Sequence, residues 1–171
     1  MASTSRERVY QALQFEGPDR APRNLWSLPW AELHFPEALK KIRDDFPDDF
    51  AGAPGYCRET SRTIGNEYSV GRYTDPWGSV FVNLQEGVIG EVKEPLISDW
   101  TIDAAKVHIP REWLTIDTDR VNAFCGRTEK FVTGGCCPRP FERLQFLRGT
   151  ENLYMDLAYD SAEVRTLIGM V

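Results

Sequence analysis

The stretch that most constrains the fold of this chain runs from Lys130 to Gly149, KFVTGGCCPRPFERLQFLRG. Its first four residues, KFVT, favour a short β-strand, and the two glycines that follow allow a sharp turn or a close approach of the backbone to a ligand. Pro138 or Pro140 can open a helix, because the N–H that proline lacks would be unpaired there anyway. The pattern predicts a strand, a glycine turn and a helix. The loop then follows the carboxyl end of the strand, where α/β folds bind ligands.

The helix of this unit is expected to present Phe141, Leu144 and Leu147 on one face and to end at Gly149. The glycine loop also has a plainer interpretation as a tight turn beside two buried thiols, and the sequence leaves both open. Arg139 is the strongest candidate in the chain for binding an anion, because the amides of a helix N-terminus would assist it.

Composition excludes several classes of protein. The chain has 171 residues, 42% hydrophobic and 27% charged, which is typical of a globular protein with one domain as the default. A net charge of −6 without a cluster of Lys and Arg argues against a nucleic-acid partner. The chain has no apolar run of about 18 residues, so no membrane span is predicted. The N-terminus has no apolar signal segment. Four cysteines are too few for a disulfide framework, so a cytoplasmic, reduced protein is expected.

The elements before residue 68 are read from caps and prolines. A capping box at Thr4 and Glu7 predicts the first helix. An extended piece is expected over residues 20–27, a helix opening at Pro36, and a strand over residues 49–53. Two acidic pairs, at 44–45 and 48–49, are expected to be solvated charges near a helix end, with acid–base or metal chemistry as the alternative.

The middle of the chain has a different texture. From Tyr68 to Trp100, β-favouring residues alternate with turn signals, which predicts an antiparallel meander of two or three strands. Helical stretches are expected over residues 102–107 and 117–129, followed by a helix capped by Thr150. A final helix has an Asp160–Glu163 capping box and an apolar stripe that reaches the last residue.

Three sets of segments, taken in order, resemble the uroporphyrinogen decarboxylase superfamily, in particular its methyltransferase-like and uncharacterised branches. The first set joins the leading helix, RERVYQAL, to GPDRAP; the second is TDPWG with the later GEV and PL; the third is the glycine-proline stretch with GTE and Asp156-Leu157. The resemblance implies an α/β fold, the amino-terminal half of a (β/α)8 TIM barrel with an inserted antiparallel β-hairpin or meander. Such barrels need about 250 residues.

The resemblance also fixes the expected organisation. Residues 1–171 would form a single partial domain, with the first βα units in 1–67, the inserted hairpin in 68–100, and a further βα unit and helices in 101–171. The carboxyl-terminal barrel half is expected to be absent, which agrees with a final apolar stripe that no cap closes.

The function implied for the full-length protein is corrinoid- or thiol-linked methyl transfer, and this chain alone is expected to lack the chemistry. One alternative is a porphyrin carboxy-lyase, although the segment Asn24–Trp30 has none of the arginines that a polycarboxylate substrate needs. The other alternative is a non-catalytic half-barrel binding module. The expected partners are a small-molecule substrate, a corrinoid protein and a further copy of the chain, with neither nucleic acid nor membrane among them.

The candidate site residues follow from the expected strands. Three lie at or beyond the end of the first strand, where they can line a pocket or pack against the hairpin, and four belong to the glycine loop and the helix after it: Arg23, Trp26, Trp30, Gly134, Gly135, Cys136 and Arg139. No catalytic residue is assigned. No cofactor and no metal ligand are expected within the chain, since His34 and His108 are isolated. The resemblance places zinc ligands, and the contact with a corrinoid partner, in the other barrel half.

Overall fold

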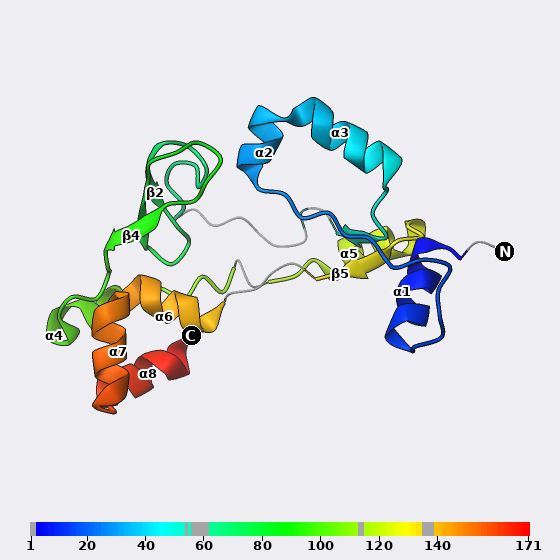
Figure 1. Cartoon of the computed structure of the whole chain (residues 1–171). Coiled ribbons are helices and arrows are strands. Elements are labelled where there is room, and N and C mark those ends of the chain that lie inside the picture. Colours follow the sequence, from blue (N-terminus) through cyan, green and yellow to red (C-terminus); the bar gives the residue numbers. More distant parts are fainter. Residues whose placement is uncertain (1–2, 54, 56–61, 113–114, 135–138) are drawn as a thin grey trace. The chain divides into compact units, whose positions relative to one another are not determined.

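The computed structural model describes residues 3–53, 55, 62–112, 115–134 and 139–171. The chain divides into two compact units, Met1–Arg58 with Thr115–Cys136, and Glu59–Leu114 with Cys137–Val171. The fold is mixed α/β, with a small parallel sheet in the first unit and a three-strand antiparallel sheet in the second (Figure 1). The expected α/β class and meander are therefore confirmed, and the described residues form no closed barrel.

The described residues of the first unit form a two-strand parallel sheet and four helices. Its elements are α1 (Ser5–Leu13), α2 (Pro29–His34), α3 (Pro36–Asp45), β1 (Phe50–Gly52), α5 (Thr118–Arg127) and β5 (Phe131–Thr133). Strand β1 pairs with β5 in parallel, with Ala51 opposite Val132. Both members of the capping box that opens α1 are present, and Pro36 begins α3, as the sequence predicts.

Residues 20–27, expected to form an extended piece, are not a strand of the sheet. Their backbone bond to the strand region runs from the Asp49 N–H to the Arg23 carbonyl, at 2.8 Å. At Leu25 the N–H donates to the Asp48 side chain instead, at 2.6 Å. A side-chain acceptor therefore takes a donor that a regular sheet would pair with the backbone.

The second unit packs helices beside the antiparallel sheet β2-β3-β4. Its elements are β2 (Gly71–Thr74), β3 (Val80–Asn83), β4 (Glu91–Glu94), α4 (Trp100–Asp103), the 3₁₀-helix η1 (Ala104–Lys106), α6 (Pro140–Arg148), α7 (Thr150–Ala158) and α8 (Ala162–Met170). The core of this unit joins the turn before β3 to the helices through Trp77, Ile97, Leu144, Leu147, Leu153, Val164 and Leu167.

Three expectations about these helices need correction. Phe141 is 51% exposed, whereas Leu144 and Leu147 are buried as predicted. Thr150 is the first residue of α7 and not its cap, because Gly149 ends α6 at φ +80° and serves as the N-cap of α7. The cap of α8 is Ser161, whose hydroxyl accepts from the Val164 N–H. Asp160 lies one residue too early and pairs with Arg165.

In the part of the chain that the structure describes, every helix falls short of the length and apolar character that crossing a membrane requires.

Candidate functional site

The carboxyl ends of β1 and β5 form the edge at which the sequence predicts a ligand. Because the two strands are parallel and Gly52 lies opposite Thr133, the loops that follow them leave the sheet at the same end. A side chain added at Gly134 would meet no atom within 4 Å, so close packing does not require glycine there. Gly135 and Cys136 lie outside the described residues, and their role stays a prediction.

Arg23 is committed to contacts within the first unit. Its N–H donates to Asp49 Oδ2 at 2.7 Å, and its guanidinium carbon lies 5.0 Å from the centroid of the Phe46 ring. A guanidinium stacked on an aromatic face is held in place and keeps its donors in one plane. The residue therefore joins the segment before α2 to the end of α3.

The two tryptophans of the candidate site differ in environment. Trp26 is 81% exposed. Trp30 lies in the first turn of α2, and its ring centroid is 4.6 Å from that of His34 and 5.7 Å from that of Phe35. The Trp30 indole thus packs against its own helix and the residue after it, while Trp26 presents an open indole face to solvent.

A network of buried charge fixes the other end of β1. Asp49, fully buried, precedes β1 and accepts from Arg8 Nη1 and Arg20 Nη1, each at 2.6 Å. Burial alone would raise the pKa of Asp49, but hydrogen bonds from Arg20, the Arg23 amide and Arg8 outweigh it and hold this pKa well below its ordinary value. The hydrogen bond from Arg8 likewise lowers the pKa of Asp19 to about 2.

This network corrects one expectation about the acidic pairs. Asp44 and Asp45 are solvated, as expected, and pair with Lys40 and Lys41 one turn earlier in α3. Asp49 is not solvated, because its carboxylate satisfies donors from the first helix and from the segment at 20–23. It lies at the amino end of β1, away from the edge where the loops leave. Its role is to anchor the strand.

Arg6 positions β5 in a similar way. Its Nη2 donates to the carbonyls of Cys125 and Thr128, at 2.9 and 2.5 Å, and its backbone N–H donates to the Glu129 carbonyl at 2.9 Å. These acceptors lie at the end of α5 and just beyond it, so one side chain of α1 ties that helix end to the start of the strand.

Arg139 belongs to the second unit, and Arg23, Trp26, Trp30 and Gly134 belong to the first. It is the N-cap residue of α6, with φ +48°, and its Nη1 lies 2.8 Å from Glu142 Oε2 in the first turn of that helix. Its charge is therefore partly balanced. An anion bound at this helix end would compete with the glutamate for the guanidinium.

The sequence did not predict the buried ion pair between Asp75 and Arg143. Asp75 Oδ1 accepts from the N–H groups of Trp77 and Ser79, at 3.0 and 2.8 Å, and Oδ2 accepts from Arg143 of α6. The Arg143 guanidinium also lies 5.0 Å from the Trp77 ring centroid. Trp77, in the turn of the TDPWG segment, is 1% exposed and belongs to the core of the second unit. The sequence pattern did not predict that Arg143 binds this turn to α6.

Tyr73 lies close to this pair in the second unit. Burial, with the nearby charges of Glu67 and Asp75, raises the pKa of Tyr73 to about 12. Its hydroxyl therefore stays protonated at neutral pH and can donate or accept a hydrogen bond, but does not act as a base.

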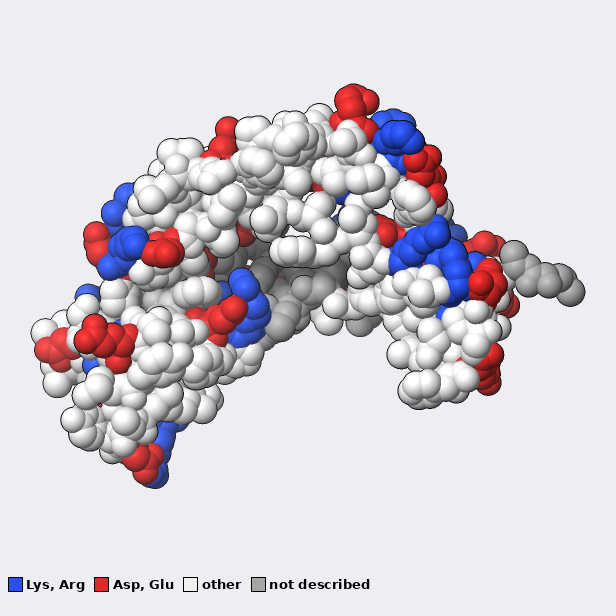
Figure 2. All heavy atoms as spheres, in the orientation of Figure 1, with Lys and Arg blue, Asp and Glu red and all other residues white. Residues whose placement is uncertain are grey.

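Within the described ranges, no group of three or more His, Cys, Asp or Glu side chains is arranged to hold a metal ion. His108 Nε2 lies 3.5 Å from a Glu112 carboxylate oxygen, and His34 packs on Trp30. Lys and Arg are interspersed with Asp and Glu over the face drawn in Figure 2. Chemically, the described candidate residues offer aromatic surface and arginines that already have partners.

Comparisons of the chain with models of protein families, with curated proteins and with solved structures gave no significant match.

Proposed function

We propose that this chain is the amino-terminal part of a uroporphyrinogen-decarboxylase-like barrel enzyme whose full-length form carries out corrinoid- or thiol-linked methyl transfer. The observation that supports the proposal most is the parallel pairing of β1 with β5. A (β/α)8 barrel is built from parallel strands, so an antiparallel pair at this point would have opposed it. The antiparallel sheet lies between β1 and β5 in sequence, where the resemblance places an inserted hairpin.

The proposal divides the chemistry between two parts of the barrel. The described residues supply two parallel strands, whereas such a barrel needs eight. The thiol would be activated as a zinc-bound thiolate, held by residues outside this chain. This chain would contribute barrel wall and part of the pocket, with Trp26 as an open apolar surface and the Asp49 network as the anchor of β1.

Porphyrin decarboxylation is the alternative function, and the contacts that Arg20 and Arg23 already make count against it. A polycarboxylate substrate calls for guanidinium groups free to bind carboxylates in pairs. Arg20 already binds Asp49, and Arg23 lies on Phe46. A titration of the chain with a porphyrin polycarboxylate, followed by tryptophan fluorescence, is expected to show no saturable binding. Tight binding that is lost in Arg23→Gln would favour the decarboxylase instead.

The direct test combines the coding sequence beyond codon 171 with an assay of its full product. We expect a second barrel half with a His-x-Cys motif and a later Cys. We also expect methyl transfer from a methylated corrinoid to a thiol, seen as a change in the corrinoid absorption spectrum. A continuation that lacks those ligands, together with no methyl transfer, would count against this function. A stop codon directly after Val171 would favour the half-barrel binding module.

A further inference from the structure

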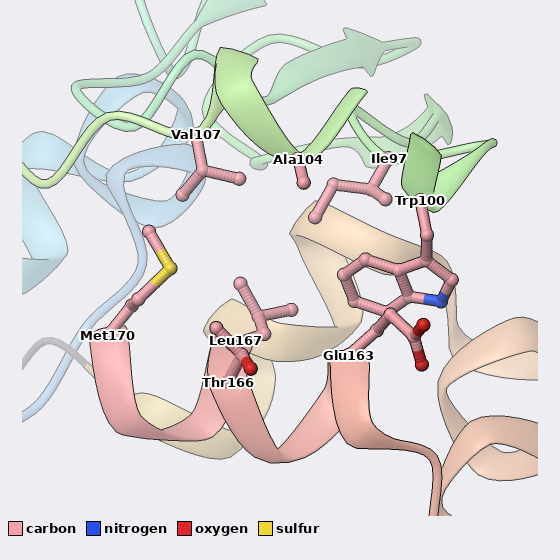
Figure 3. Close-up of a pocket in the computed structure, with 8 residues that line it drawn as sticks. All are labelled: Ile97, Trp100, Ala104, Val107, Glu163, Thr166, Leu167 and Met170. Atoms are coloured by element: carbon pink, nitrogen blue, oxygen red, sulfur yellow. The ribbon is translucent and has the colours of Figure 1, made fainter. Parts of the chain in front are cut away.

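An apolar cavity of about 120 Å³, partly open to solvent, lies in the second unit between α8 and the segment from Ile97 to Val107. Figure 3 shows the two rows of side chains that face each other across it. Ile97, Trp100, Ala104 and Val107 come from α4, η1 and their flanks, and the facing residues of α8 are Glu163, Thr166, Leu167 and Met170. In another protein, an apolar cavity of about 150 Å³ stays dry and binds benzene. The space therefore suits one small ring or a short branched chain.

The walls of the cavity are held in place before any ligand arrives. The Trp100 indole N–H donates to Asp156 Oδ2 at 3.1 Å, and the Arg148 guanidinium carbon lies 4.9 Å from the indole ring centroid. Arg148 Nε donates to the same carboxylate oxygen at 2.7 Å. Fixed walls reduce the entropy that binding would lose.

The base of the cavity is equally well anchored. Ile97 is fully buried, and its N–H donates to the Leu147 carbonyl at 2.8 Å. The helix that carries Trp100 is tied down by Asp103, whose Oδ2 accepts from the N–H groups of Ser98 and Asp99 at 2.9 Å each. The cavity is thus a preformed feature of the second unit.

The residues that line the cavity carry charge on one side only, while the Arg148 guanidinium on the Trp100 ring lies outside this lining and is paired with Asp156. Glu163, exposed in the first turn of α8, is the one charged residue among those that line it, and the lining offers no basic side chain. The Thr166 hydroxyl donates to the Ala162 carbonyl at 3.0 Å and is occupied within the helix. A carboxylate beside an indole and an apolar floor matches a ligand with an apolar body and a cationic head.

We propose that this cavity binds a small organic cation, a single ring or short branched alkyl group that bears an ammonium group. The apolar body fills the space between Trp100 and Leu167, and the ammonium group faces the Glu163 carboxylate. The plainer role of Glu163 is to balance the dipole of α8, as acidic residues in a first helical turn commonly do. The two roles give different results when the charge of the ligand is changed, and neither depends on the methyl-transfer proposal.

The test uses the whole chain labelled with ¹⁵N, with the Trp100 indole N–H signal as the reporter. The probes are 2-phenylethylammonium and its neutral counterpart 2-phenylethanol, which share the ring and the chain length. We expect the ammonium probe to shift the Trp100 signal saturably and to bind about two- to fivefold more tightly than the alcohol, the range expected for an exposed ion pair.

Three variants make the result specific. Glu163→Gln is expected to remove the preference for the ammonium probe. Glu151→Gln, an exposed acidic residue in the first turn of α7, is expected to leave it unchanged. Ala104→Leu fills the cavity and is expected to weaken binding of both probes at least about tenfold. If Ala104→Leu fails to fold by circular dichroism, the comparison of the two Glu→Gln variants still decides the matter.

Two outcomes would overturn the proposal. One is the absence of a saturable shift of the Trp100 signal with the ammonium probe up to about 10 mM, which is about ten times the roughly 1 mM Kd of a weak site. The other is equal affinity of the two probes for the unsubstituted chain, since Glu163 would then take no part in recognition.

Discussion

Asp49 and Asp75, two buried carboxylates, connect parts of the chain that are far apart in sequence. Asp49 binds arginines 41 and 29 residues before it, and Asp75 binds one 68 residues after it. A buried charge without a partner is costly, so each aspartate requires its arginine to arrive in one position. These pairs therefore determine how distant segments meet within each unit.

Replacing Arg143 tests whether the buried Asp75–Arg143 pair holds the second unit together. Arg143→Met keeps most of the side-chain volume but leaves one oxygen of the buried Asp75 carboxylate without its partner. We expect the free energy of unfolding to fall by about 3 kcal/mol, the scale for breaking a buried pair from one side. Urea unfolding followed by circular dichroism measures it.

The matched control for that variant is Arg139→Met. Arg139 lies four residues earlier and pairs with Glu142 at the surface, so its loss is expected to cost less than about 1 kcal/mol. An equal loss of unfolding free energy in the two variants would show that breaking the buried Asp75–Arg143 pair costs no more than breaking an exposed pair.

Stability at low pH depends on the Asp49 network. The pKa values of Asp49 and Asp19 are depressed in the folded chain. Their contribution is therefore complete above the unfolded value, about 3.9, and is lost as the pH falls through the folded values. We expect the free energy of unfolding to drop between about pH 4 and pH 2, measured by urea unfolding at several pH values.

Two variants separate Asp49 from general acid effects. Asp49→Asn should be less stable at pH 5 and should lose less stability on acidification than the unsubstituted chain. Asp44→Asn changes an exposed pair with Lys40 and should follow the unsubstituted profile. A wild-type acid profile in Asp49→Asn would show that the carboxylate does not govern acid stability.

These partners could not be read from the sequence, because the spacing between a charge and its partner carries no local pattern. The pairs of Lys40 with Asp44 and Lys41 with Asp45 could be, since one helical turn separates them. Asp48-Asp49 has the same composition as Asp44-Asp45, yet Asp49 is buried and Asp44 and Asp45 are exposed. Burial of Asp49 comes from contacts with α1 and residues 20–23, which only the folded unit defines.

At the level of elements, the β3–β4 hairpin depends on Gly90. A Cβ there would lie 2.0 Å from the Val82 carbonyl oxygen, and the Gly90 N–H donates to Asn83 Oδ1 at 2.7 Å. We expect Gly90→Ala to destabilise the second unit by about 3 kcal/mol, because backbone atoms must move. Thermal unfolding followed by circular dichroism measures the change.

Gly169 of α8, in the same unit, is the matched control, since an added Cβ there meets no atom within 4 Å. Gly169→Ala should be neutral or stabilising by about 0.5 kcal/mol, as alanine favours a helix. A similar loss of stability in both variants would mean that the close approach at Gly90 is not limiting.

Local caps and breakers predicted most elements. The Thr4 capping box, Pro36 and Pro140 mark where α1, α3 and α6 begin. Prediction failed where two elements share one residue, as at Gly149, and where a hydroxyl and a carboxylate compete for one cap, as at Ser161. The extended segment at residues 20–27 had strand character in its composition, but Asp48 and Asp49 take its backbone donors at Arg23 and Leu25.

At the level of the whole molecule, exposed apolar side chains predict self-association. The larger ones on the first unit include Phe35, Ile42 and Phe46, at 54%, 42% and 53% exposure. A two-strand parallel sheet is also below the size at which sheets are stable without added strands. We expect sedimentation velocity of the chain to show a rise in mean mass with protein concentration. The rise should persist in about 0.5 M salt, because salt at that concentration screens exposed charges but does not weaken apolar contacts.

The form of that association separates two of the functional readings. A single dimer that melts cooperatively would favour the half-barrel binding module, because a closed symmetric interface buries one defined face. Open-ended association would favour the barrel proposal, in which further strands cover these faces. Ile42→Glu, at an exposed position of α3, should reduce association, and Lys41→Glu should not, since it alters charge in the same helix without removing apolar surface. A chain that stays monomeric at high concentration would contradict the prediction and would mean that these exposed side chains need no cover.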